Sequence, residues 1–108
     1  MHPVRRLGED FDWREYLKWE EIADDILERV RRGLEHWCEN VQDDPLECYY
    51  AHAGMDPYEI LLVYSGARED VLRRMPESTY KSLEAALTSF IERKIRVWER
   101  RARAWWRG

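Results

Sequence analysis

The fold is decided by one stretch, residues 78–107, which reads STYKSLEAALTSFIERKIRVWERRARAWWR. It contains no glycine or proline, and its apolar residues recur at steps of three and four, the spacing that lines one face of an α-helix. This C-terminal apolar stripe consists of Tyr80, Leu83, Leu87, Phe90, Ile91, Ile95, Trp98, Ala102 and Trp105. Arginines on the other face lie near the negative end of the helix dipole. We therefore predict a long amphipathic helix over about 78–106.

A second long amphipathic segment begins near residue 12. Asp12 and Glu15 have the spacing of a capping box, and Phe11 is placed to pack against the first turn. Gly33 raises an alternative in which a first helix ends at Arg32. We favour one helix over about 12–42, because helical spacing continues through Gly33 in the apolar residues Tyr16, Ala23, Leu27, Val30, Leu34, Trp37 and Val41.

The middle of the chain repeats one helix signal twelve residues apart. DPLE at 44–47 is followed by Gly54, and DPYE at 56–59 is followed by Gly66. Asp as N-cap, Pro in the first turn and Gly as terminator predict short helices at 45–53 and 57–65. The alternative is a β-hairpin at 46–65, because the aromatic and branched residues there are typical of strands. A further short helix at 67–75 would be stopped by Pro76.

With 108 residues, 37% charged and 44% hydrophobic, the chain is long and apolar enough to fold as one domain. We expect an all-α, compact helical bundle over 1–108, with 1–9 as a loose lead-in, whereas the hairpin would make it α+β. The longest purely apolar run, residues 60–64, is too short to span a bilayer. The spacing of Cys38 and Cys48 indicates no disulfide framework, so we expect a cytoplasmic protein with reduced thiols and no membrane partner.

The net charge of −4 conceals an uneven distribution along the chain. Residues 9–28 carry nine acidic side chains against two basic ones, and residues 35–59 carry seven acidic ones and no Lys or Arg. Residues 93–107 reverse the balance, with seven basic side chains against one acidic. Opposite charge favours packing of the acidic N-terminal helix near the basic C-terminal one. The same charges can also reach outward to a partner.

Two sets of residues are candidate contact surfaces. The acidic ridge consists of Glu21, Asp24, Asp25 and Glu28, and would suit a basic groove that normally holds nucleic acid. The basic end consists of Trp98, Arg101, Arg103, Trp105, Trp106 and Arg107, and Trp and Arg are enriched in binding hot spots. The alternatives are a solvated face for the ridge and core packing for Trp98 and Trp105. Trp106 lies about 100° around the helix from Trp105, so the two rings cannot share one narrow seam.

His36, Cys38, Cys48 and His52 are a candidate metal set, but their spacing argues against zinc. Cys48 and His52 have the i, i+4 spacing of a shared ligand, whereas His36 and Cys38 point to opposite sides of a helix. Cys38 lies on the apolar side and is interpreted as a core residue. We predict no metal, cofactor or catalytic residue.

Two arginines stand at short spacing from a histidine, as Arg31-x4-His36 and Arg29-x6-His36. The pattern resembles the short Arg–His signature of the HEPN family of helical ribonucleases. In that family a polar residue commonly follows the Arg, and in this chain Val30 or Arg32 replaces it. The resemblance implies RNA cleavage that depends on His36. A further minor alternative is a DNA-binding helix-turn-helix over residues 56–75, but its second helix mixes acidic and basic residues.

Together these features favour a non-enzymatic protein-protein interaction module. It would inhibit or regulate a larger protein partner by occupying its surface, and that partner would belong to a nucleic-acid-handling complex of the phage or host-defence type. The first alternative is a nucleic-acid-binding protein that uses the basic end, and the second is the HEPN-like ribonuclease. Self-association as a homodimer through the C-terminal helices is compatible with each hypothesis.

Overall fold

The computed structural model describes residues 12–66 and 69–107, and all regular structure in those ranges is helical. Its α-helices are α2 (Trp13–His36), α3 (Pro45–Ala53), α4 (Pro57–Ser65), α5 (Glu69–Arg74) and α6 (Glu77–Arg107), and a π-helix, η1 (Trp37–Val41), follows α2. The all-α prediction is confirmed, and the β-hairpin proposed for 46–65 is wrong. The lead-in at 1–9 and the contact expected of Phe11 lie outside the described residues.

Local capping explains why residues 45–65 form two helices and no hairpin. The Asp44 carboxylate accepts the backbone N–H groups of Leu46 and Glu47 at 3.1 and 3.2 Å. The Asp56 carboxylate accepts the N–H of Tyr58 at 3.1 Å. Helix α4 ends at Gly66, whose φ of 70° lies in the left-handed region that glycine adopts without steric cost. These caps pair the backbone N–H groups in the first turns of α3 and α4. They explain why the segment is helical although its composition is typical of strands.

The first long helix continues through Gly33, as predicted. Trp37 keeps right-handed helical dihedrals, and the chain remains helical to Val41 before Gln42 becomes extended. The last turns are π-helical, and the Gln42 N–H donates to the Trp37 carbonyl at 2.9 Å. A Cβ atom on Gly33 would lie 2.9 Å from Cδ1 of Tyr64. The glycine therefore allows α4 to approach α2 closely, and it does not end the helix.

The long C-terminal helix begins at Glu77, one residue before the predicted start at Ser78. The Tyr80 N–H donates to the Pro76 carbonyl at 2.9 Å, so Ser78 lies inside the first turn and does not precede it. The preceding short helix covers Glu69–Arg74, within the predicted 67–75. The first two residues of that predicted range lie outside the described residues.

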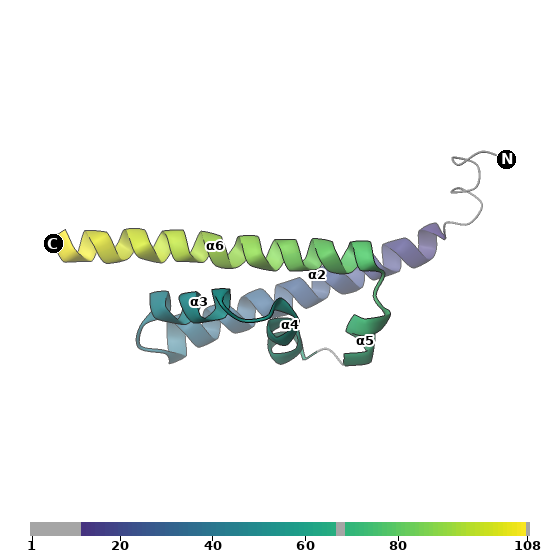
Figure 1. Ribbon diagram of the computed structural model, residues 1–108, viewed down its shortest axis with the longest axis horizontal. Helices are drawn as coiled ribbons and strands as arrows, with labels where there is room; N and C mark the ends of the chain where they lie inside the picture. The colour runs from purple at the N-terminus through teal and green to yellow at the C-terminus, as the bar shows by residue number, and fades with distance from the viewer. Residues whose placement is uncertain (1–11, 67–68, 108) are drawn as a thin grey trace.

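Helices α2 and α6 lie side by side and run in the same direction, and α3, α4 and α5 carry the chain back from the end of α2 to the start of α6 (Figure 1). The core is formed between these layers by Ala23, Ile26, Val30, Leu34, Cys38, Cys48, Tyr49, Ile60, Leu61, Leu72, Met75, Leu83, Leu87, Phe90 and Ile91. The molecule measures 67 × 27 × 19 Å, and the last turns of α6 extend beyond η1 and α3 (Figure 1). No helix in the described part of the chain has the length and apolarity needed to cross a membrane.

Candidate protein-binding groove

A groove of about 550 Å³ lies where the end of α6 passes the loop between η1 and α3. One wall is the loop and the first residues of α3, and the other is the end of α6. This C-terminal groove is lined by Asp43, Asp44, Pro45, Leu46, Trp98, Arg101, Ala102, Trp105 and Trp106. It therefore combines an acidic edge, a small apolar floor and an aromatic, basic edge.

The three tryptophans of the basic end occupy different environments. Trp98 is half-buried against the core, and the Arg101 guanidinium lies over its ring, 4.5 Å from the ring centroid. Trp105 and Trp106 are 83% and 84% exposed. The core-packing interpretation therefore holds in part for Trp98 and is wrong for Trp105. The apolar stripe on α6 continues past the point where its packing partners end.

A partly buried ionic cluster fixes α6 just before the groove. The Lys94 ammonium lies 2.8 Å from a carboxylate oxygen of Glu35 and 2.8 Å from one of Glu39. The Tyr49 hydroxyl donates to Glu39 at 2.5 Å. The two ion pairs of Lys94 connect the end of the acidic first helix to the basic last helix, as the charge distribution predicted. They fix the position of α6 at the groove.

The cluster shifts the pKa values of its members in opposite directions. Burial alone would raise the pKa of Glu39, but hydrogen bonds from Lys94, Tyr49 and Trp98 outweigh burial and lower it. Burial alone would lower the pKa of Lys94, but its bonds to Glu35 and Glu39 raise it. Burial and the adjacent Glu39 carboxylate raise the pKa of Tyr49. All three groups therefore keep their ordinary charge states at neutral pH.

A second contact joins α3 to α6 beside the groove. The Tyr50 hydroxyl donates to the carboxylate of Glu99. This hydrogen bond to Glu99 raises the pKa of Tyr50. Tyr50 is exposed, so the contact orients α6 without contributing to the core.

The acidic ridge lies on the exposed face of α2, apart from the C-terminal groove, and half of its charge is paired locally. Asp25 forms an ion pair with Arg29 at 3.0 Å, and Glu28 forms one with Arg32 at 2.9 Å. No ion pair among the described residues involves the other two members, Glu21 and Asp24. The exposed ridge and the groove form two separate candidate contact surfaces.

The remaining predicted site residues are placed as follows. Arg103 is exposed on α6, and the side chain of Arg107 lies outside the described residues. Arg29 pairs with Asp25, and the Arg31 guanidinium lies 5.7 Å from the centroid of the Phe90 ring. Both arginines of the HEPN-like pattern therefore have partners other than His36.

Helix α5 does not present the basic face that the helix-turn-helix alternative requires. Arg73 pairs with Glu69 at 2.6 Å, and Arg74 pairs with Asp70 at 3.9 Å. Each pair joins an arginine to the acid one turn earlier, so the charges that would meet a phosphate backbone are neutralised locally.

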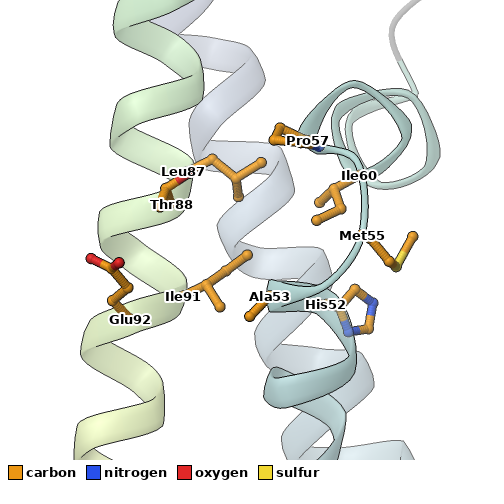
Figure 2. Close-up of a pocket in the computed structure, with 9 residues that line it drawn as sticks. All are labelled: His52, Ala53, Met55, Pro57, Ile60, Leu87, Thr88, Ile91 and Glu92. Carbon is orange, nitrogen blue, oxygen red and sulfur yellow. The ribbon is translucent and has the colours of Figure 1, made fainter.

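A smaller crevice of about 100 Å³ lies between the α3–α4 link and α6 (Figure 2). His52 and Glu92, the two titratable side chains on it, stand at opposite sides (Figure 2). The ring nitrogens of His52 are both engaged: Nε2 lies 2.6 Å from the Tyr64 hydroxyl and Nδ1 lies 2.7 Å from the Cys48 carbonyl oxygen. The crevice does not present a paired acid and base.

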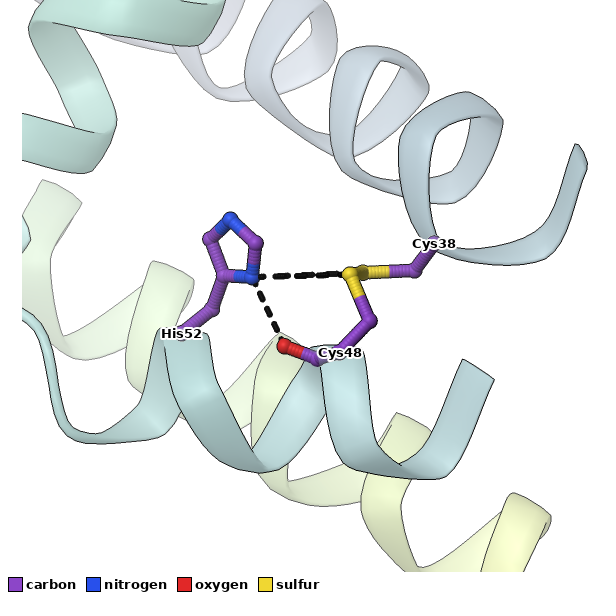
Figure 3. Close-up of side chains that lie close together, drawn as sticks. All are labelled: Cys38, Cys48 and His52. Atoms are coloured by element: carbon purple, nitrogen blue, oxygen red, sulfur yellow. Dashed lines mark hydrogen bonds between the residues drawn. A yellow bond between two sulfur atoms is a disulfide. The ribbon is translucent and has the colours of Figure 1, made fainter. Parts of the chain in front are cut away.

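The structure brings together three members of the rejected metal set, Cys38, Cys48 and His52, in a buried cluster (Figure 3). Cys38 and Cys48 form a disulfide, with Cα atoms 5.4 Å apart, so the expectation of reduced thiols is wrong. The loop between η1 and α3 reverses the chain and places the two cysteines face to face. Cys38 is fully buried, as predicted, whereas His36 is exposed and takes no part in the cluster. The i, i+4 spacing of Cys48 and His52 was the available signal.

Comparisons with protein-family models, curated proteins and solved structures found no significant match to this chain.

Proposed function

We propose that this chain is a non-enzymatic protein-binding module that inhibits or regulates a larger protein by occupying its surface. The observation that carries the proposal is the pair of exposed indoles, Trp105 and Trp106, at the edge of the C-terminal groove. Large exposed aromatic groups beside arginine are typical of binding hot spots, because they bury much area at a small entropy cost.

The groove has an apolar floor that suits an apolar side chain of the partner, and the groove carries charges of both signs on its walls. Asp43 and Asp44 lie on one wall and Arg101 on the other, so a partner segment could be oriented by its own charges. The α6 end is held by the Lys94 cluster and by the Tyr50–Glu99 hydrogen bond, so few groups need ordering when a partner docks.

The acidic ridge supports a second, electrostatic contact with a basic partner. Glu21 and Asp24, the two exposed ridge carboxylates outside the Asp25–Arg29 and Glu28–Arg32 ion pairs, would accelerate association with the basic channel of a nucleic-acid-handling protein. The phage or host-defence setting of such a complex is part of the proposal. The proposed compartment is the cytoplasm, where thiol reductants would act on the Cys38–Cys48 disulfide.

The test begins with capture of partners on the immobilised chain from the native host, and each captured protein is then purified for titration calorimetry. Trp105→Ala combined with Trp106→Ala should weaken binding by about 2–4 kcal/mol, the size of a hot-spot loss. Trp13→Ala, which removes an exposed indole at the opposite end of the molecule, is the matched control. Equal affinity of the double variant and the wild type would contradict the groove as the contact.

The contribution of the ridge is tested separately by charge reversal of Asp24, Asp25 and Glu28 to lysine. The expected result is slower association with the purified partner and a weaker salt dependence, with an unchanged circular dichroism spectrum. Unchanged association kinetics would remove the ridge from the proposed contact.

The second candidate function is nucleic-acid binding by the basic end. It is favoured by Arg96, Arg100 and Arg103, which are exposed on α6 close to two exposed indoles that can stack on bases. Fluorescence anisotropy with single-stranded DNA and RNA should then show affinity that falls steeply with salt. No binding at low salt would eliminate it.

The HEPN-like alternative retains a direct test. Cleavage of labelled RNA by the wild type and its loss in His36→Ala would support it. Absence of cleavage, or equal cleavage by both proteins, would remove this hypothesis.

A further inference from the structure

We propose that Cys38, Cys48 and His52 form a binding site for Zn²⁺ or a similar soft divalent cation when the disulfide is reduced. This site goes beyond the proposed protein-binding function and uses none of the exposed tryptophans. η1 supplies Cys38, and one face of α3 supplies Cys48 and His52 (Figure 3). All three side chains are buried, and their candidate ligand atoms lie within 4.8 Å of one another.

The positions of the ligand atoms fit a tetrahedral metal. Nδ1 of His52 lies 3.9 Å from Sγ of Cys38 and 3.7 Å from Sγ of Cys48. With zinc–sulfur bonds of about 2.3 Å and zinc–nitrogen bonds of about 2.0–2.1 Å, a tetrahedral site has nitrogen–sulfur edges of about 3.6 Å. The imidazole nitrogen is therefore already close to the required distance from both sulfurs. Of the three distances between ligand atoms, the sulfur–sulfur distance must lengthen most, and reduction of the disulfide permits this.

Tyr64 provides the supporting contact that a histidine ligand needs. In the disulfide state Nδ1–H can donate to the Cys48 carbonyl while Nε2 accepts from the Tyr64 hydroxyl. A metal on Nδ1 requires the other tautomer, in which Nε2–H donates to the Tyr64 oxygen. A hydroxyl can donate or accept, so Tyr64 can hold the ring in both states. The ring must also turn Nδ1 from the Cys48 carbonyl towards the metal.

A surface pocket adjoins the cluster. Cys48 and His52 line a pocket of about 370 Å³ whose other walls are Trp37, Gln42, Asp43, Asp44, Glu47 and Ala51. The three side chains would leave a fourth coordination position, and a water from this pocket can fill it. The carboxylates at the pocket favour entry of a cation.

The chemistry balances in two steps. A dithiol reductant donates two electrons: its thiolate attacks Sγ of Cys48, the cysteine that lines the pocket, and releases the Cys38 thiolate. The second thiol of the reductant then displaces Cys48 from the mixed disulfide, which leaves two protein thiols and a cyclic, oxidised reductant. Zn²⁺ then binds two thiolates and neutral His52, and two thiol protons pass to solvent. No electrons move in the binding step. The disulfide and the metal exclude each other, because both use the sulfur atoms of Cys38 and Cys48.

The test uses Co²⁺ as the spectroscopic probe. The purified chain is reduced with dithiothreitol, desalted without oxygen and titrated with CoCl₂, in parallel with the oxidised chain. The expected result is one Co²⁺ per reduced chain, with visible absorption of a tetrahedral site and a thiolate-to-cobalt charge-transfer band that Zn²⁺ displaces. The oxidised chain should show neither band.

Variants separate ligation from general effects on the fold. His52→Ala should weaken Co²⁺ binding by more than 100-fold, and Tyr64→Phe, which keeps the ring, should weaken it by about 10–100-fold. His36→Ala is the control and should leave binding unchanged, because His36 is exposed and outside the cluster. Circular dichroism of each reduced protein checks that it is folded.

Three results would overturn the proposal. The first is a folded, reduced chain without the charge-transfer band, and the second is equal affinity of the wild type and His52→Ala. The third is loss of the helical spectrum on reduction, because the dithiol state then has no site to offer.

Discussion

The two halves of α6 have the same sequence period, but the apolar stripe is buried in the first half and becomes exposed along the second. In residues 77–95 the stripe residues Leu83, Leu87, Phe90 and Ile91 are buried against α2, α4 and their neighbours. In residues 96–107 the same stripe leads to Trp105, which is 83% exposed. A helical period therefore identifies the apolar face of a helix, and the length of its partners decides how much of that face is buried. The partners end here because η1 stops at Val41 and α3 begins at Pro45.

Truncation in the buried half should have the largest effect on stability. Leu87 is 1% exposed, and Leu87→Ala should lower the free energy of unfolding by about 2–5 kcal/mol through lost burial and a residual cavity. Urea denaturation followed by circular dichroism measures this. If Leu87→Ala lowered the free energy of unfolding by less than Trp105→Ala does, the difference between the two halves of α6 would be contradicted.

The close crossing of α2 and α4 defines the space that the buried half of α6 fills. Gly33→Ala improves helix propensity by about 1 kcal/mol, but its Cβ would meet the Tyr64 ring, which His52 holds in place. Overpacking costs about 1–3 kcal/mol, so we expect net destabilisation of about 1 kcal/mol. Gly54→Ala is the control, since its nearest contact would be an ordinary 3.6 Å, and it should not destabilise. Equal thermal stability of the two variants would contradict this prediction.

Lys94 marks the boundary between the two halves. Its side chain is 22% exposed, and Lys94→Met should cost roughly 1–2 kcal/mol, because Glu39 is then left half-buried without its cation. Arg96→Met, a nearby exposed position, should stay within about 0.5 kcal/mol of the wild type. Equal urea midpoints for Lys94→Met and Arg96→Met would show that the ionic cluster does not stabilise the fold.

The same cluster predicts a pH dependence. Folding lowers the pKa of Glu39 below its ordinary value of 4.5, so the unfolded chain binds this proton more tightly than the folded chain. Its contribution to stability is present above pH 4.5 and is lost as pH falls through the lowered value. Folding raises the pKa of Lys94, so its contribution is present below its ordinary value of 10.5 and is lost at more alkaline pH. Urea midpoints from pH 2 to 7 should show a smaller acid loss for Lys94→Met than for the wild type.

The exposed half should show the smallest stability effect. Trp105→Ala should change the free energy of unfolding by less than about 0.5 kcal/mol, since a surface substitution leaves no cavity. A loss above about 2 kcal/mol would mean that the indole is buried in solution, for example against a second copy. Light scattering across protein concentrations identifies that case.

The sequence predicted the elements whose signals are local. The bounds of α3 and α4 follow from Asp44 and Asp56, because a cap acts within one turn. The features it missed depend on the chain reversal between η1 and α3. That reversal joins Cys38 to Cys48, and it places Asp43 and Asp44 opposite Trp98 and Arg101, so the aromatic wall of the groove was predicted and the acidic wall was not.

The shared direction of α2 and α6 has a consequence for synthesis on the ribosome (Figure 1). An antiparallel neighbour could have folded back onto α2 directly, but a parallel one must wait until the return path through α3, α4 and α5 has been made. The contacts of α2 and α3 with α6 thus form only after residues 77–107 have left the exit tunnel. The packing of α6 on α2 and α3 therefore follows the formation of the earlier helices, because it joins parts of the chain that are distant in sequence.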